Sequence, residues 1–154
     1  MLRGVGAVLM TAAGLWLGWE LSRFWAGRRR MLESCGMLLQ TILDAVQYRR
    51  LPAGEILAEI KQQPAFAAFV TPDSRTLREL APPCLLTGEQ ARHFTNCMQS
   101  FGSQGLSAQC EQLRREIAYF DRCADEVRGK EQAAAALCPR VGLSLGGMLA
   151  LALL

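Results

Sequence analysis

The sequence has few of the residues that build catalytic or metal sites. It contains one histidine, His93, and its six cysteines include no CxxC pair. A structural zinc site needs three or four Cys or His ligands at short spacing, which this distribution does not supply. His93 and Cys97 are four residues apart and can share a helix face, as the base and thiol of a thiol enzyme require. No third catalytic group accompanies them, so we expect no enzymatic activity, and a membrane thiol enzyme is the least favoured alternative.

The cysteines also lack the pattern of a disulfide framework. They are Cys35, Cys84, Cys97, Cys110, Cys123 and Cys138, and the four from Cys84 to Cys123 recur every 13 residues. On a helix this interval rotates each cysteine by about 220° from the last, so they cannot share one face. We interpret them as small apolar residues of a protein in a reducing compartment.

The middle of the chain has no excess of charge of either sign. Residues 28–139 carry 14 Lys or Arg, all but Arg3, Arg23 and Arg140, against 13 Asp or Glu. Nucleic-acid binding depends on a basic surface, so this balance predicts no nucleic-acid partner. The tail sequence GLSLGG lacks the lysine of a phosphate-binding loop. We therefore expect no cofactor, no resident metal and no small-molecule substrate.

The two ends of the chain are apolar. Residues 4–19 and 141–154 contain no charged residue. The first apolar run is followed by WAG rather than by the small residues of a cleavage site, so it is predicted to be retained. A helix from Leu2 to Gly27 would be about 39 Å long and would exceed a hydrocarbon core of about 30 Å. Residues 140–154 are expected to form a shorter membrane segment, whose apolar residues 141–154 reach only about 21 Å, and whether it fully spans is left open.

Charged and aromatic residues follow the first apolar run and predict its orientation. Trp16, Trp19 and Trp25 suit the interfacial end of a membrane helix, and Glu20 and Arg23 are spaced to pair there. The basic residues on this side are Arg23, Arg28, Arg29 and Arg30. The positive-inside bias then places the central domain in the cytoplasm. Two pairs of glycines, Gly14 with Gly18 and Gly142 with Gly146, would let membrane helices approach closely.

The central domain, residues 28–139, has helical periodicity throughout. Leu32, Cys35, Leu39, Ile42 and Val46 keep the 3-4 spacing of a packing seam. Pro52 opens a second helix over about residues 53–62, and Thr87 with Gln90 forms a capping box for a helix over about 88–101. A last helix, capped by Ser107, carries a second seam. Its members are Leu106, Cys110, Leu113, Ile117, Phe120, Ala124 and Val127.

These elements predict an all-α fold. Two long helices, continuous with the N-terminal and C-terminal membrane segments, would pack as an antiparallel bundle, and the short helices between them would form a distal cap. The domains are expected to be an N-terminal transmembrane anchor (1–27), a cytoplasmic helical bundle (28–139) and a C-terminal membrane segment (140–154).

Several segments of this sequence resemble stage III sporulation protein AB, a membrane protein family of endospore-forming bacteria. The similarity is carried by the opening MLRGVGAVLMTAAGLWLGWELS, by MLLQTILDAVQYRRLPAGEILAEI, and by FGSQGLSAQCEQL leading to GLSLGGMLALALL. The positions that match are Tyr48, Pro52, Glu55, Phe101, Gly102, Gln112 and Gly142. The chain departs from the family in its cysteines, in LPAGE, and in a shortened region around residues 64–86.

The resemblance implies a function. The family acts in the mother-cell membrane that faces the forespore, within a secretion-like channel assembly, and is similar to the cytoplasmic domain of the type II secretion and type IV pilus platform protein F. The resemblance therefore implies a non-enzymatic adaptor that contacts the lipid bilayer, other stage III sporulation channel subunits and a partner ATPase. The alternative is a platform subunit of a secretion or pilus system outside sporulation.

Overall fold

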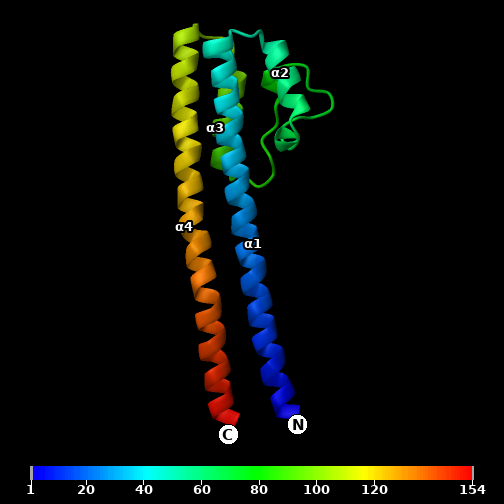
Figure 1. The fold of residues 1–154 in the computed structure, drawn as a ribbon, viewed down its shortest axis with the longest axis vertical. Coiled ribbons are helices and arrows are strands. Elements are labelled where there is room, and N and C mark those ends of the chain that lie inside the picture. Colours follow the sequence, from blue (N-terminus) through cyan, green and yellow to red (C-terminus); the bar gives the residue numbers. More distant parts are fainter. Residues whose placement is uncertain (1, 154) are drawn as a thin grey trace. The chain divides into compact units, whose positions relative to one another are not determined.

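The computed structural model describes the backbone of residues 2–153 and the side chains of residues 12, 16 and 18–136. Within residues 2–153 the chain is helical and contains no β-strand, which confirms the predicted all-helical class. The elements, several labelled in Figure 1, are α1 (Leu2–Asp44), the π-helix η1 (Ala45–Arg49), α2 (Ala53–Gln62), the 3-10 helices η2 (Pro64–Phe66) and η3 (Leu77–Glu79), α3 (Gly88–Gln99) and α4 (Leu106–Leu153).

The chain forms two compact units. One comprises Met1–Gly27 with Glu126–Leu154, and the other comprises Arg28–Asp125. Helices α1 and α4 each contribute residues to both units. Among the residues that the structure describes, no helix combines the length and the apolar character needed to cross a membrane.

In the unit of residues 28–125, α1 and α4 pack side by side and run in opposite directions. The backbone of α1 at Gly36 approaches Asp121 of α4, where an added Cβ would lie 3.2 Å from the Asp121 Oδ1 atom. In η1, which continues from the end of α1, the Gln47 side chain accepts a 2.9 Å hydrogen bond from Arg114. As the residue number rises on one helix it falls on the other, so the pair is antiparallel.

The predicted seam of α1 forms part of the core of this unit. Leu32, Cys35, Leu39 and Ile42 are buried, as are the neighbouring Leu38 and Leu43. Val46, the last predicted seam residue, is only half-buried because the helix changes to η1 at Ala45. An i to i+5 turn takes up more residues than an α turn, so it shifts the phase of the side chains that follow. Sequence periodicity gave no signal of this π-helix.

The predicted seam of α4 is confirmed except at its start. Cys110, Leu113, Phe120, Ala124 and Val127 are buried, and Ile117 is partly buried. Leu106 is 56% exposed because it is the first residue of the helix and has no facing layer. The predicted cap at Ser107 is wrong. The helix begins one residue earlier, and the carbonyl of Gly105 accepts the hydrogen bond from the Gln109 backbone N–H.

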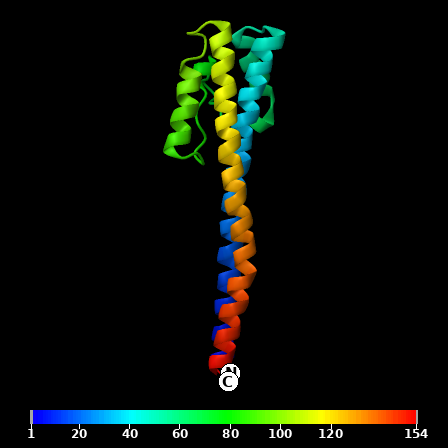
Figure 2. The same cartoon turned by 90° about the vertical axis from the view of Figure 1, so that its left-hand side faces the viewer.

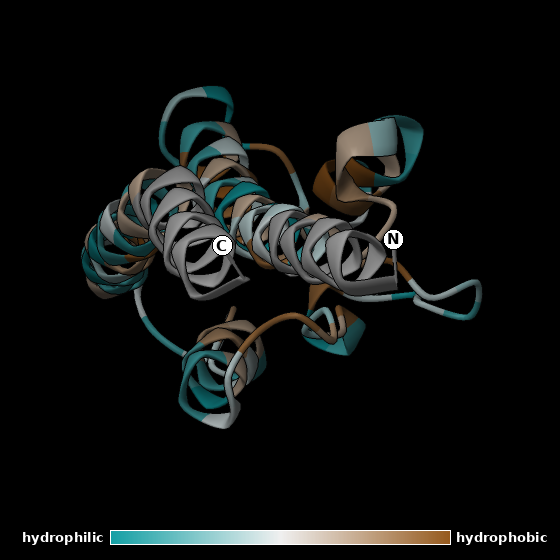
Figure 3. Ribbon diagram, turned by 90° about the horizontal axis from the view of Figure 1, so that it is seen from below, coloured by the Kyte–Doolittle hydropathy of each residue, from teal (hydrophilic) through white to brown (hydrophobic). Residues whose placement is uncertain are grey.

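Helix α2 begins after Pro52 at the predicted residue and lies beside the end of α1 (Figures 1 and 2). Its residues Ile56, Leu57 and Ile60 are buried, and their spacing gives one apolar face. Along the helices in Figure 3, hydrophobic and hydrophilic residues both occur on the described turns, as expected for amphipathic helices.

The long connection between α2 and α3 is held to the core by aromatic side chains. The Phe66 and Phe69 rings are 6.5 Å apart, and the Phe69 ring lies 5.6 Å from that of Phe94 on α3. A backbone hydrogen bond from Ala81 to the Phe69 carbonyl, 3.0 Å long, closes the loop. Burial of the three phenylalanines therefore orders a segment that has only single-turn helices.

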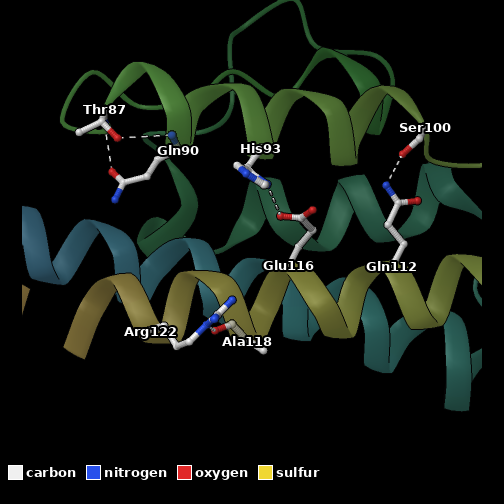
Figure 4. Close-up of polar contacts among 8 residues, drawn as sticks. All are labelled: Thr87, Gln90, His93, Ser100, Gln112, Glu116, Ala118 and Arg122. Carbon is white, nitrogen blue, oxygen red and sulfur yellow. Dashed lines mark hydrogen bonds and ion pairs between the residues drawn. The ribbon is translucent and has the colours of Figure 1, made fainter. Parts of the chain in front are cut away.

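Helix α3 packs lengthwise along α4 rather than capping the bundle. His93 contacts Glu116 and Ser100 contacts Gln112, so the contacts extend along both helices in antiparallel order (Figures 2 and 4). The prediction of a distal cap of short helices is therefore wrong for α3. The buried apolar residues of α3 form a stripe along the helix and include Phe94, Cys97 and Met98. Because the stripe runs along the helix, packing α3 lengthwise against its neighbours buries it.

Candidate functional site

The interface between α3 and α4 contains the single histidine of the chain. The His93 Nδ1 atom lies 3.2 Å from the Glu116 Oε2 atom, as Figure 4 shows. One turn away, the Gln112 side-chain amide donates a 2.8 Å hydrogen bond to the Ser100 hydroxyl. These two contacts fix the register of α3 on α4. Glu116 was not among the residues that the sequence singled out.

The start of α3 has the capping box that the sequence predicted. The Thr87 hydroxyl accepts a hydrogen bond from the Gln90 backbone N–H, and the Gln90 side chain accepts one from the Thr87 backbone N–H (Figure 4). Both contacts satisfy backbone donors that otherwise have no partner in the first turn of a helix. The prediction is confirmed, and the cap fixes the point at which α3 begins.

The His93 ring is stacked on a tyrosine of α4. The centroids of His93 and Tyr119 are 4.1 Å apart and the rings are inclined by 22°. Burial, followed by the charge and the side-chain hydrogen bond of Cys123, raises the pKa of Tyr119 to about 12. The phenol therefore stays protonated in neutral solution and packs as a neutral aromatic surface for the imidazole.

Cys97 does not have the properties of a catalytic thiol. It is 2% exposed, and burial together with the charge of Glu116 raises its pKa to about 12. A thiol enzyme uses the thiolate, whose formation this environment opposes. His93, the proposed base, contacts Glu116 and Tyr119 instead. These observations count against the thiol-enzyme alternative.

Metal ligation has no candidate among the described side chains. Residues 12, 16 and 18–136 contain no group of three or more His, Cys, Asp or Glu side chains placed to hold a metal ion. Among these described residues, the five cysteines are free thiols, namely Cys35, Cys84, Cys97, Cys110 and Cys123, and Cys138 lies outside them. Burial raises the pKa of Cys35 to about 12, so this thiol behaves as an apolar core residue.

Three residues singled out by the resemblance lie on the surface near the junction of α1 and α2. Tyr48, within η1, is 75% exposed, and Pro52 and Glu55 are also exposed. Beside them Arg49 and Glu59 form an ion pair of 2.8 Å between η1 and α2. The pairing with Arg49 lowers the pKa of Glu59. This surface has an aromatic residue but no convergent catalytic groups.

Three more of the residues from the resemblance occupy structural positions where α3 and α4 meet. Phe101 is buried, and its carbonyl accepts a 3.0 Å hydrogen bond from Arg78. Gly102 has a φ of +77°, which favours glycine and lets the chain turn after α3. Gln112 bonds Ser100. These three residues therefore stabilise the fold.

The unit of residues 1–27 and 126–154 has a concentration of aromatic side chains on α1. Trp16 and Trp19 are 66% and 56% exposed, and their rings are 6.1 Å apart. The Arg23 guanidinium lies 5.1 Å from the centroid of the Trp19 ring. Lys130 of α4 lies 5.6 Å from the centroid of the Trp25 ring. Arg23 therefore contacts an indole, a partner that the sequence analysis did not predict.

The remaining predicted residues are placed as follows. Arg29 forms a 3.0 Å ion pair with Glu33, Arg28 is partly buried, and Arg30 and Glu20 are exposed. Gly18 is buried. Gly14, Gly142 and Gly146 lie outside the residues whose side-chain surroundings the structure describes.

Comparison with known proteins identifies one family. Residues 3–71, which include most of α1, all of η1 and α2, and the first part of the following loop, match the family model described as stage III sporulation protein AB. No curated protein and no solved structure matches the chain. The match confirms the resemblance that the sequence indicated and supports the assignment of this chain to the stage III sporulation protein AB family.

Proposed function

We propose that this protein is a non-enzymatic, membrane-anchored assembly subunit of a channel between mother cell and forespore. The family assignment indicates a role in stage III of sporulation. In the proposal, residues 1–27 and 140–154 attach the chain to the mother-cell membrane that faces the forespore. The central helices, on the cytoplasmic side, dock a partner ATPase or another stage III channel subunit.

The observation that carries the docking proposal is the exposure of Tyr48. A tyrosine that is 75% exposed adds little to the core, and residues 52–55, which follow it in the chain, are exposed as well. Aromatic side chains with a polar tip are frequent energetic centres of protein interfaces. Tyr48 also lies within the part of the chain that matches the family.

The position of Tyr48 is fixed by the local backbone. Arg50 ends η1 with a φ of 49°, and the Leu51 backbone N–H donates a 3.2 Å hydrogen bond to the Ala45 carbonyl. The Arg49 and Glu59 pair joins the same segment to α2. A side chain held on an ordered backbone loses less conformational entropy on binding than one on a mobile loop. The tyrosine therefore suits a docking surface.

The test is co-purification of the detergent-solubilised full chain with the sporulation ATPase and with each other channel subunit. The Tyr48→Ala variant is expected to lose at least about tenfold in affinity for the true partner, a typical loss at an interface hot spot. Tyr48→Phe, which keeps the ring, is expected to retain most of the binding.

Leu85→Ala is the matched control, since Leu85 is an exposed apolar residue of the loop before α3. Equal losses in Leu85→Ala and Tyr48→Ala would show that Tyr48 has no special role. If the wild-type chain binds neither the ATPase nor any channel subunit, the proposed assembly function is wrong.

A further inference from the structure

The exposed aromatic face of α1 is an apolar surface feature that the proposed docking function does not use. Trp16, Trp19, Glu20 and Arg23 are spaced by three and four residues and therefore share one side of the helix. All four are exposed. A soluble protein rarely exposes two neighbouring tryptophan side chains to this extent. We therefore expect this side of the helix to contact an apolar or interfacial partner. We call these four residues the aromatic face.

The side chains of the aromatic face suit the boundary between lipid tails and headgroups. Indole rings have an apolar body and one N–H donor, and they concentrate at this depth of a bilayer. Arg23 lies over Trp19, where the ring accommodates part of its guanidinium and leaves its N–H donors available at the edge. Guanidinium groups bind phosphate oxygens through two parallel hydrogen bonds.

The charge pattern of the same helix favours an anionic headgroup. From Glu20 to Arg30, α1 carries four arginines and one glutamate. An excess of basic residues immediately beside an apolar run attracts anionic phospholipids. Residues 4–19, which precede this pattern, contain no charged residue.

We propose that the aromatic face binds anionic phospholipid headgroups, with Trp16 and Trp19 at the interface and Arg23 on the lipid phosphate. This inference rests on the proposed membrane attachment of residues 1–27 and adds the class of lipid that the segment selects. Glu20, on the same side of the helix, limits the selectivity through its negative charge.

The three tryptophans make the proposal measurable in the full-length protein. All of them lie between Trp16 and Trp25, so the tryptophan fluorescence of the chain reports on this segment alone. The full chain is reconstituted in phosphatidylcholine vesicles that contain a small fraction of either brominated phosphatidylglycerol or brominated phosphatidylcholine. Bromine quenches a tryptophan only on close contact, and the ratio of the two quenching efficiencies gives the relative affinity for the anionic lipid.

The wild-type protein is expected to prefer brominated phosphatidylglycerol by about fivefold, the effect of one cation near an anionic surface. Arg23→Gln should lower this preference, Arg23→Lys should lower it less, and Glu20→Gln should increase it. Arg92→Gln is the matched control, because Arg92 is an exposed arginine on α3 and its loss changes the net charge equally.

Other results of these measurements would contradict separate parts of the proposal. If neither brominated lipid quenches the fluorescence, the tryptophans do not meet lipid, and the proposed attachment through residues 1–27 fails. Equal quenching by both lipids would leave attachment in place but overturn the anionic selectivity. A preference that Arg23→Gln leaves unchanged, or that Arg92→Gln lowers equally, would overturn the role of Arg23. Circular dichroism of each variant verifies that the helices are intact.

Discussion

His93 of α3 and Glu116 of α4 approach within 3.2 Å, although 23 residues separate them in the chain. The contact is oriented by the Tyr119 ring, which stacks on the imidazole. It is the feature that turns the one histidine of the sequence from a candidate catalytic base into a link between two helices.

Replacing Glu116 with Gln should destabilise the packing of α3 on α4 modestly. The His93 side chain is 41% exposed, so solvent screens the pair and the expected loss is below about 1 kcal/mol. Thermal unfolding of the detergent-solubilised chain, followed by circular dichroism, measures this loss. Glu111→Gln, on the exposed side of α4, should change stability little.

Substitutions at Gly36 test how closely α1 and α4 approach. Alanine at Gly36 would place its Cβ 3.2 Å from Asp121 Oδ1, and the exposed Asp121 side chain can move away. The gain in helix propensity of up to about 1 kcal/mol is then partly offset by this displacement. Gly36→Val should destabilise the protein, because its branched side chain cannot be accommodated by a small movement of Asp121.

The comparison is made with Gly129→Ala, where no atom lies within 4 Å of the added methyl group. This variant should raise the melting temperature more than Gly36→Ala does. Equal effects of the two alanine variants would show that the helices are farther apart at Gly36 than described here.

The seams of the two long helices predict unequal effects for two leucines of α4. Leu113 is 1% exposed, so Leu113→Ala should cost about 2–5 kcal/mol through lost burial and the cavity that remains. Leu106→Ala should cost little, since Leu106 is exposed at the start of the helix. Chemical denaturation of both variants measures the difference, and similar midpoints would contradict the assigned seam.

The buried thiol of Cys35 makes the fold sensitive to alkaline pH. Its pKa is about 12 in the folded chain, against 9.0 for an unperturbed thiol. The neutral thiol is therefore favoured in the folded state. Its contribution to the free energy of unfolding is complete below pH 9 and is lost as the pH rises toward 12. Between these values the free energy of unfolding falls by about 1.4 kcal/mol per pH unit for one such thiol.

Unfolding free energies measured on both sides of pH 9 test this dependence. Stability should fall above pH 9, and Cys35→Ala should fall less steeply than the wild type. The Cys84→Ala variant is the control, because Cys84 is exposed. A Cys35→Ala slope equal to that of the wild type would show that Cys35 does not contribute to the alkaline transition.

Much of the fold followed from local sequence signals. The 3-4 spacing from Leu32 to Ile42 identified the buried side of α1, and Pro52 identified the start of α2. The capping box at Thr87 located the start of α3. These features depend on residues within one or two turns of each other, and such patterns are visible in a single sequence.

The features that the sequence did not predict depend on contacts between distant segments. The lengthwise packing of α3 on α4 arises where the stripe of Phe94 and Met98 meets the core, and the pairing of His93 with Glu116 depends on that docking. Nothing local distinguishes Glu116 from the other acidic residues of α4. The contact of Arg23 with Trp19 was missed because the spacing also suited a pair with Glu20.

The π-helix at Ala45–Arg49 sets the direction in which Tyr48 points. An α-helix continued through these residues would keep the phase of the Leu32 seam, whereas the wider π turn rotates the following side chains relative to it. The side of the helix on which Tyr48 lies is thus specified by the number of residues in this turn. A single-residue deletion between Ala45 and Arg49 is the smallest change that would turn the tyrosine to another side of the bundle while leaving its identity intact.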